Sequence, residues 1–454
     1  MKSIAKHWQR IAVTLLPLLF AFLHVIGTLP LGVVQHLDDI IYDARLRATS
    51  PETLDPRIVI IDIDEKSLAE VGRWPWGRNR MAQLVDELFD RQQIALLGFD
   101  VVFAEPDESS GLARLTELAR TEFREQPGFS ERVRQLQPAL DFDGTFARAL
   151  SNRPVVLGYY LSSERQARTS GVLPTPVISG ESLQGRALQA TSWSGYGSNI
   201  DVLAHAAGRA GFFNSITDSD GVVRSLPLLA EYKGQYYESL ALAMFRTLVG
   251  LPDVIPGFPR DSFLARSAQG MDRVLLQRAD RTLTIPVDDR VAALVPFRGR
   301  GGSAGGSFQY VSASDVLRSR LAPASLKDKI ILVGTTAPGL LDLRVTPVGE
   351  TYPGVEAHAN LISGLLDGNM LLQPDYALGY EIMVLTLAGL VLALFLPTLS
   401  ALRAVGLSVA VLLLLIGANF WLYLSYGLVL PLATSLTMVV TAFALNMSFG
   451  YFVE

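Results

Sequence analysis

The C-terminal part of the chain is almost free of charge. From Tyr376 to Glu454 only Glu381, Arg403 and Glu454 carry formal charges. Three apolar segments lie in this stretch, at 380–396, 404–424 and 428–450, with short turns between them. Each falls within the range of about 17–25 residues that crosses the hydrocarbon core of a bilayer as a helix. A purely soluble protein is therefore excluded, because a buried helical hairpin does not explain three such segments in succession.

A fourth apolar segment, 11–34, lies near the N-terminus behind Lys2, Lys6 and Arg10. It is longer than the apolar region of about 7–15 residues in a cleavable signal peptide, and no A-x-A cleavage site follows it. We therefore expect a retained membrane anchor and four transmembrane helices in total.

Basic residues predict the orientation of these helices, because positive charge marks the cytoplasmic side of a membrane protein. Arg403 lies between the second and third segments, and the basic N-terminus precedes the first. Residues 1–10 and 451–454 are thus expected in the cytoplasm, and residues 35–375 are expected to be exported.

Composition excludes several other classes of protein. The net charge of −5 argues against a nucleic-acid partner. The absence of cysteine excludes disulfides, thiolate metal sites and cysteine nucleophiles. Only five histidines occur, and outside the membrane segments none pair at i,i+4. We expect no metal, no cofactor and no catalytic residues.

The exported region alternates between strand and helix patterns. Arg57–Asp64 predicts a buried strand, Arg80–Arg91 a helix and Ile94–Phe103 a second strand. This order indicates a βαβ unit whose two strands pair in parallel. Further strands and a helix are predicted at 154–161, 329–334 and 354–366. The fold class is thus a membrane protein with a large extracytoplasmic α/β domain, built on a mixed, mostly parallel sheet, between one N-terminal and three C-terminal transmembrane helices.

Asp218-Ser219-Asp220-Gly221 lies between two apolar runs. An Asp-Gly pair in that setting predicts a β-hairpin turn. The same residues resemble part of a calcium loop, but they lack the Glu at the twelfth position of an EF-hand. The hairpin is the simpler interpretation.

Acidic residues follow the two strands of the predicted βαβ unit. Asp62 and Asp64 end the first, and Asp100, Glu105 and Asp107 lie at or beyond the end of the second. Because the carboxyl ends of parallel strands share one sheet edge, these carboxylates are expected to converge on a cationic ligand or a divalent ion. The alternative is helix capping and pairing with arginines, namely Arg78, Arg80 or Arg344.

Trp74 and Trp76 lie on the loop between the same two strands. They could line a ligand pocket or cover the edge of the sheet, and the sequence leaves both interpretations open. Asp38, Asp39 and Asp43 lie beside Arg45 and Arg47 after the first membrane segment. We call residues 38–47 the stalk. Its charged side chains could pair between protomers or could simply be solvated.

The order of motifs resembles a known family. YDARLR follows the first span, and IVIIDIDEKSL, GRWPWGR and FDVVFAEPD come next. DGTFARAL, GFFNSITDSDGVVRSLPL and KIILVGTTAPGLLDLRVTPVGETYPGVEAHANLISGLL follow, directly before the three C-terminal spans. This sequence resembles a CHASE2 sensor with its membrane module, and the resemblance covers nearly the whole chain.

The resemblance implies the extracytoplasmic sensor of a bacterial inner-membrane receptor that works as a homodimer. Such sensors feed cyclases or kinases in the cytoplasm, and a class III adenylate/guanylate cyclase is the output expected first. The sequence ends just past the fourth span without such a domain. Among the residues that carry the resemblance, Asp100 and Asp342 are the preferred functional candidates.

Two other functions remain open. In the first, the chain is a membrane scaffold that docks a periplasmic protein without signalling. In the second, it is a tethered enzyme in which a pair such as Asp62 and Asp100 performs acid–base chemistry. No credible nucleophile–base pair, metal cluster or cofactor loop supports the enzyme. The main hypothesis is a module that senses an unknown extracytoplasmic ligand or periplasmic protein.

Overall fold

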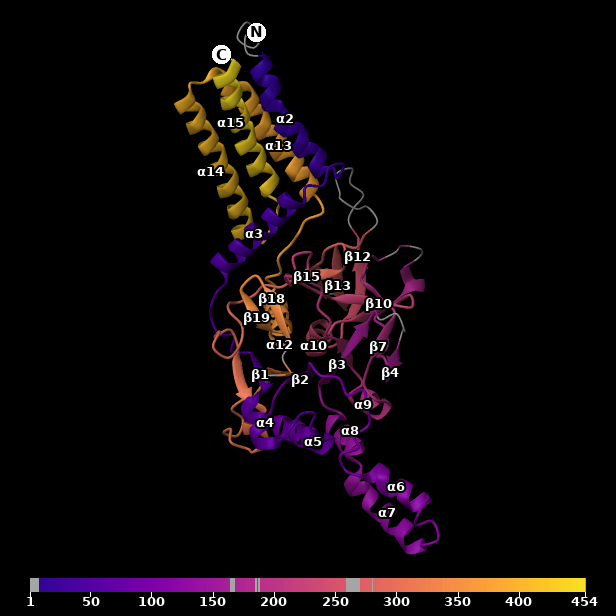
Figure 1. Ribbon diagram of the computed structural model, residues 1–454. Helices are drawn as coiled ribbons and strands as arrows, with labels where there is room; N and C mark the ends of the chain where they lie inside the picture. The colour runs from indigo at the N-terminus through magenta and orange to yellow at the C-terminus, as the bar shows by residue number, and fades with distance from the viewer. Residues whose placement is uncertain are drawn as a thin grey trace.

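The chain forms a bundle of four apolar helices and an α/β domain, with helix α3 (Gly32–Thr49) between them (Figure 1). This computed structural model describes residues 8–453 except 164–167, 184–185, 187, 259–269, 280, 338 and 341. The bundle consists of α2 (Trp8–Val25), α13 (Ala377–Phe395), α14 (Ala401–Tyr426) and α15 (Ala433–Val453). The first turn of α2 and the last turn of α15 lie together at the end of the bundle farthest from the α/β domain (Figure 1).

Small and apolar side chains pack the interior of the bundle. Leu18, Leu385 and Val439 are buried there. Gly389 allows α13 to approach α2, since a Cβ at this position would come within 2.7 Å of Leu18. Each of the four helices is long and apolar enough to cross a membrane, so the structure has a candidate span in each of the four regions that the sequence predicts.

The first span differs from the expected 11–34. Helix α2 ends at Val25, and Gly27 then adopts a left-handed φ of +80°. The chain turns before Pro30, and α3 begins at Gly32 as a separate helix. The last span likewise begins at Ala433 rather than at 428, because residues before Pro431 are extended and bridge to Leu372.

A large sheet forms the centre of the α/β domain. Its strand order is β16-β1-β17-β2-β3-β7-β4, and β8 also pairs with β3. All pairings are parallel except that of β3 with β7. The strands are β1 (Ile58–Ile63), β2 (Leu96–Phe99), β3 (Val155–Ser162), β4 (Thr169–Ser170), β7 (Gly195–Gly197), β8 (Ala210–Phe212), β16 (Gln309–Ser312) and β17 (Ile330–Thr335). The mixed, mostly parallel sheet is confirmed.

Helices cover both faces of this sheet, because alternate residues of its strands are buried on opposite sides. Ile58 and Ile60 face the core that contains α10 (Leu240–Leu248) and α12 (Gly354–Asp367). Val59, Ile61 and Ile63 face the other core. That side carries α4 (Glu65–Val71), α5 (Arg78–Asp86), η1 (Glu87–Arg91), α8 (Phe142–Leu150), α9 (Asp201–Ala207) and α11 (Ala313–Leu317).

The predicted pairing of the first two strands is wrong. Strand β17 lies between β1 and β2 and pairs with both in parallel. Its six residues, Ile330 to Thr335, match the six of β1 one by one, and Ile330–Val333 are all buried. Strand β17 comes from the C-terminal part of the domain sequence. It occupies the position next to β1 that the βαβ pattern assigns to β2.

The hairpin predicted at Asp220-Gly221 is also absent. Gly221 does make a turn, with φ +83°. However, β8 before the turn pairs with β3, and β9 (Ser225–Pro227) after it pairs with β15 (Ala292–Leu294). The side chains of Asp218 and Asp220 bond Arg224 instead.

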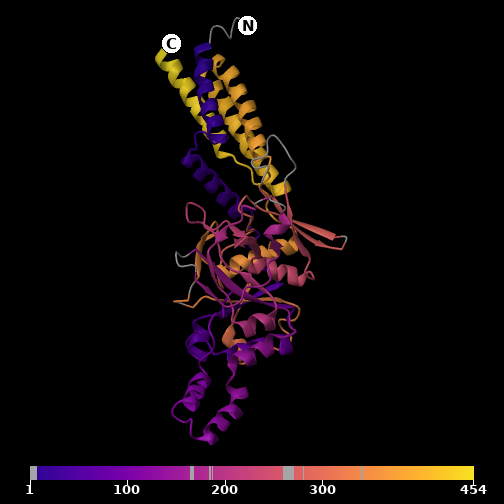
Figure 2. The same cartoon turned by 90° about the vertical axis from the view of Figure 1, so that its right-hand side faces the viewer.

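The remaining elements form smaller sheets and one projection. The smaller sheets contain β5 (Ile178–Ser179), β6 (Ser192–Trp193), β10 (Leu229–Tyr232), β11 (Gln235–Glu238), β12 (Asp253–Gly257), β13 (Arg273–Arg278), β14 (Arg281–Pro286), β18 (Leu343–Thr346) and β19 (Gly349–Pro353). Short 3₁₀ helices are η2 (Gly180–Leu183) and η3 (Leu396–Thr398). Helices α6 (Leu112–Arg120) and α7 (Pro127–Leu140) project from the domain at the end opposite the bundle (Figure 2).

Candidate functional site

Asp62 and Asp100 lie at the same level of the sheet, on either side of β17. Asp62 pairs with Gly334, and Asp100 follows Phe99, the partner of Val333. The first turn of α12 fills the space over Gly334, where a Cβ would come within 2.6 Å of Val355. The predicted convergence of these two carboxylates is therefore wrong, because a strand and a helix separate them.

The Asp62 side chain is buried and hydrogen-bonded. Its carboxylate accepts hydrogen bonds from the backbone N–H of Thr336 at 3.0 Å and from the Thr336 hydroxyl at 2.6 Å. Burial raises the pKa of Asp62 to about 6, and the nearby charge of Asp64 adds to this effect. These bonds hold the turn after β17 against the end of β1.

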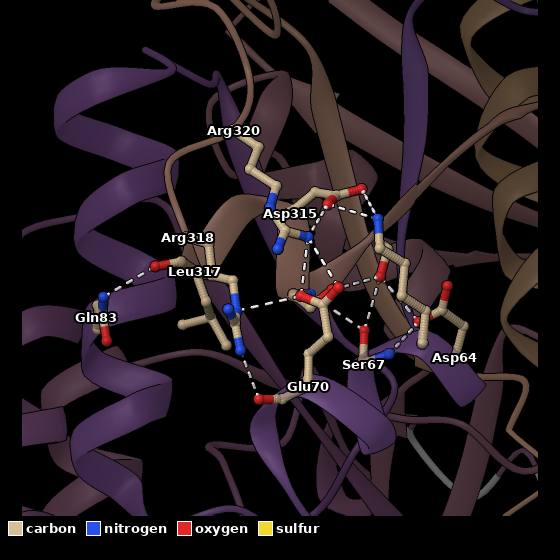
Figure 3. A network of polar contacts seen from close by, with 11 residues as sticks. Asp64, Ser67, Glu70, Gln83, Asp315, Leu317, Arg318 and Arg320 are labelled. Carbon is tan, nitrogen blue, oxygen red and sulfur yellow. Dashed lines mark hydrogen bonds and ion pairs between the residues drawn. The ribbon is translucent and has the colours of Figure 1, made fainter.

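Asp64 caps α4 by accepting a hydrogen bond from the backbone N–H of Ser67 at 2.7 Å, and it also accepts one from the Ser312 hydroxyl at 2.8 Å. Figure 3 shows the polar network around it. Glu70 pairs with Arg318 and Arg320 there. The network joins α4 to α11, so the capping interpretation holds for Asp64.

Asp100 and Asp342 form a second acidic group beside α12. Asp342 pairs with Arg344 at 2.6 Å, and its backbone carbonyl accepts from Gly354 N–H at 2.8 Å. Burial, followed by the charge of Asp342, raises the pKa of Asp100 to about 7, although Arg344 opposes the shift. His358 on α12 is buried close by, and its Nδ1 atom has no hydrogen-bond partner among the described residues. Of the predicted carboxylates, these two are brought together.

Glu105 and Asp107 lie around Arg78 at the start of α5. The Glu105 carbonyl accepts from the Arg78 guanidinium at 3.3 Å, and the Asp107 carboxylate accepts from the Arg78 backbone N–H at 2.5 Å. Burial opposes ionisation of Asp107, but hydrogen bonds from Ser109 and Arg78 outweigh it and lower the pKa. The Asp107 carboxylate thus accepts from the first turn of α5, as the capping interpretation expects, whereas Glu105 contacts the Arg78 guanidinium through its backbone carbonyl rather than its carboxylate.

The two tryptophans pack together over the sheet. The Trp74 and Trp76 rings meet edge to face with centroids 5.4 Å apart. Trp76 is 4% exposed, and its Nε1–H donates to the Gly72 carbonyl at 2.8 Å. They cover one face of the sheet, and their role in ligand binding stays a prediction.

Buried polar bonds fix α12 in the domain. Glu356 is fully buried and accepts hydrogen bonds from Gly302 N–H at 2.6 Å and from the Tyr310 hydroxyl at 2.7 Å. Asn360, one turn later, donates to the Tyr352 hydroxyl at 2.7 Å and accepts from Arg298 N–H at 2.8 Å. Because each of these bonds ends within the α/β domain, α12 belongs to its rigid core.

Helix α3 bonds the bundle through two charged side chains. Asp38 accepts hydrogen bonds from the backbone N–H groups of Leu432 and Ala433, both at 2.8 Å, at the start of α15. Arg45 donates to the Asn419 side chain of α14 at 2.5 Å. A carboxylate at a helix N-terminus is favourable, because it satisfies free N–H groups and the helix dipole.

The same helix bonds the α/β domain on another side. Arg224 donates to both carboxylate oxygens of Asp43, at 2.8 and 2.9 Å. Its guanidinium also pairs with Asp218 at 3.1 Å and Asp220 at 2.8 Å. Arg47 donates to the Pro347 carbonyl at 2.9 Å. These contacts make α3 a hydrogen-bonded link between the α/β domain and the bundle.

The structure gives Asp38, Asp43, Arg45 and Arg47 partners within the chain, which neither interpretation of the stalk charges included, and pairing between protomers stays a prediction. Arg224 lies in one of the motifs that carry the resemblance, but no functional role was predicted for it. Its only local signal is the acidic turn four residues before it. The partner Asp43 is 181 positions away, so no motif joins them.

The CHASE2 domain family matches residues 18–394 of the chain. The matched region begins within α2 and extends to the end of α13, and it contains α3 and the complete α/β domain. Neither a curated protein nor a solved structure matches the chain.

Proposed function

The chain belongs to the CHASE2 family of extracellular sensor domains of signalling receptors, and we propose that it relays an external cue to a cytoplasmic output through helix α3. The observation that carries this proposal is that α3 is hydrogen-bonded both to the bundle and to the α/β domain. One set of its side chains holds α14 and α15, and another holds Arg224 of the α/β domain. A cue that shifts the domain thereby shifts the last span.

The topology that we propose is the one given by the basic residues. The bundle then spans a bacterial inner membrane, with the start of α2 and the end of α15 on the cytoplasmic side. The α/β domain lies on the outer side. The positions of α2 and α15 support this, because the start of the first and the end of the second lie at the same end of the bundle (Figure 1). A class III adenylate/guanylate cyclase is the proposed output.

We propose a homodimer with α3 at its interface. Val33, Leu37, Ile40 and Ala44 are exposed on one stripe of α3 that faces neither the bundle nor the domain. Their alternating spacing of four and three residues is that of a coiled-coil seam, which favours a second copy of the helix. Since the chain has no cysteine, Ile40→Cys tests this directly: disulfide cross-linking in membranes supports the interface, and cross-linking equal to that of exposed Gln35→Cys refutes it.

The relay is tested by fusing a class III cyclase domain after Glu454 and measuring cyclic nucleotide in cells. We expect Asp43→Asn to change the output severalfold, because it weakens the bond between α3 and Arg224. Asp86→Asn, which removes an exposed pair with Arg153, is the matched control. Equal output from wild type and both variants at equal membrane abundance would exclude the relay.

The projecting α6–α7 hairpin favours a second candidate, a scaffold that docks a periplasmic protein. An open recess of about 530 Å³ lies at its base, lined by residues of α6 and by Asp107, Leu140 and Asp143. Leu136 on α7 is 40% exposed. A scaffold predicts that removing residues 112–140 abolishes partner binding while the fused output stays unchanged in every α3 variant.

A further inference from the structure

Three metal-ligating side chains meet where α3 approaches the α/β domain. His36, Asp39 and Asp220 each offer one ligand atom, and these atoms all lie within 4.8 Å of one another. His36 and Asp39 are three residues apart on α3, which places them on the same face of the helix. Asp220 comes from the turn before Arg224. Two parts of the fold thus supply the group.

Negative charge exceeds positive charge at this place. Arg224 pairs with Asp43, Asp218 and Asp220, and Arg290 also pairs with Asp218, so these two arginines face the four carboxylates of Asp39, Asp43, Asp218 and Asp220. Among the described residues, no hydrogen bond or ion pair reaches the carboxylate of Asp39. Its charged neighbours are Arg224 and the carboxylates of Asp43, Asp218 and Asp220. A bound cation would relieve the repulsion that this carboxylate experiences.

We propose that His36, Asp39 and Asp220 bind a divalent transition-metal ion, with Zn²⁺ as the first choice and water in the remaining positions. The imidazole distinguishes this triad from a patch of acidic side chains. Calcium and magnesium sites use oxygen ligands, whereas a nitrogen with two carboxylates suits zinc and its neighbours. The site stands on this ligand set alone and does not depend on the signalling role.

Sequence reasoning found no metal site because it searched for histidine pairs at i,i+4. Here a His-x-x-Asp pair on one helix joins an aspartate about 180 residues away, beyond the reach of any local motif. The Asp218–Gly221 segment supplies one ligand to this triad rather than a complete calcium loop. A metal at the triad joins α3 to the domain beside the bond between Asp43 and Arg224.

The test is Zn²⁺ binding by the full chain in detergent after removal of metals with a chelator. A chromophoric zinc chelator serves as the competitor, and Ca²⁺ and Mg²⁺ are titrated in parallel. The variants are His36→Ala and Asp39→Asn. His205→Ala is the matched control, because His205 also lies beside an aspartate, Asp201, at 3.1 Å, and no third ligand joins them among the residues that the structure describes.

We expect one Zn²⁺ per chain in wild type and in His205→Ala, and at least tenfold weaker binding in His36→Ala and Asp39→Asn. We also expect Zn²⁺ to raise the melting temperature of the wild type but not that of His36→Ala. Because His36 is exposed, its substitution leaves the fold intact. Equal binding in wild type and His36→Ala, or binding lost in His205→Ala, would overturn the proposal.

Discussion

Arg224 and Asp43, which are 181 positions apart in the sequence, form a bidentate ion pair with nitrogen–oxygen distances of 2.8 and 2.9 Å. Arg224 is 5% exposed, so the pair is largely shielded from water. Asp43 belongs to α3, and Arg224 follows the acidic turn of the α/β domain. This contact holds α3 against the domain, while Asp38 and Arg45 hold it against the bundle.

We predict that Arg224→Gln destabilises the protein much more than Asp43→Asn. Loss of Arg224 leaves Asp43 and Asp220 without this counter-charge, while Asp218 keeps its pair with Arg290, and losing one partner of a buried pair costs about 3–5 kcal/mol. Asp43→Asn leaves Arg224 two carboxylates and costs about 1–2 kcal/mol. Denaturant unfolding in nanodiscs measures both.

The control for this comparison is Asp86→Asn. Asp86 is half exposed in its pair with Arg153, and loss of such a pair changes the free energy of unfolding by about 0.5 kcal/mol. If Arg224→Gln matched this control, the ion pair would contribute little to the attachment of α3.

A second prediction concerns Asp38, which accepts from the first N–H groups of α15. Asp38→Ala leaves both groups without their acceptor and costs about 1 kcal/mol, the usual effect of losing a helix cap. Asp38→Asn keeps an acceptor oxygen and is expected to cost much less. Hydrogen–deuterium exchange at Leu432 and Ala433 should be faster in the alanine variant only. The same exchange rate in both variants would show that Asp38 does not hold the start of α15.

The local pattern predicted several elements correctly because their residues are buried on both faces. The strands at Ile58–Ile63 and Ile330–Thr335 are continuous apolar runs, and α12 has helical spacing from Gly354 onward. The order of the strands was out of reach, because the pairing of β1 with β17 spans about 270 residues. Local periodicity carries no information on such a pairing.

The site was predicted less well for the same reason. Asp64 and Asp107 were identified as acidic groups at strand ends, but their partners decide their roles: Asp64 caps α4, and Asp107 accepts from the Arg78 backbone N–H at the start of α5. The bonds of Asp43 and Arg45 cross 181 and 374 positions. Side-chain bonds of this kind depend on tertiary placement, so the charged stalk could be recognised but its partners could not.

A third prediction tests the packing of α12 on the sheet. Gly334→Ala places a methyl group within 2.6 Å of the branched Val355 side chain. The start of α12 must then move, and such overpacking costs about 1–3 kcal/mol. Gly98→Ala is the matched comparison, because its methyl group meets the flexible end of Met244 and should cost less. Equal destabilisation by both variants would mean that α12 is not pinned at Gly334.

A fourth prediction uses pH to test the setting of Asp100. Burial and then Asp342 raise the pKa of this carboxyl to about 7, against the attraction of Arg344, whereas its ordinary value is 3.8. The folded protein therefore holds the proton more tightly than the unfolded chain does. The stability that this provides is complete below pH 4 and is lost as the pH rises through 7.

Asp100→Asn removes this titration while keeping the size of the side chain. Relative to wild type, the variant should gain stability between pH 4 and 7 and then level off. The gain should be about 1–2 kcal/mol, because water partly screens a half-buried carboxyl. Asp62, Glu356 and His358 also titrate in this window, with pKa values of about 6, 7 and 4, and their effects cancel in the difference between the two proteins. Unfolding at several pH values gives that difference, and a difference that is constant with pH would place Asp100 in water rather than beside Asp342.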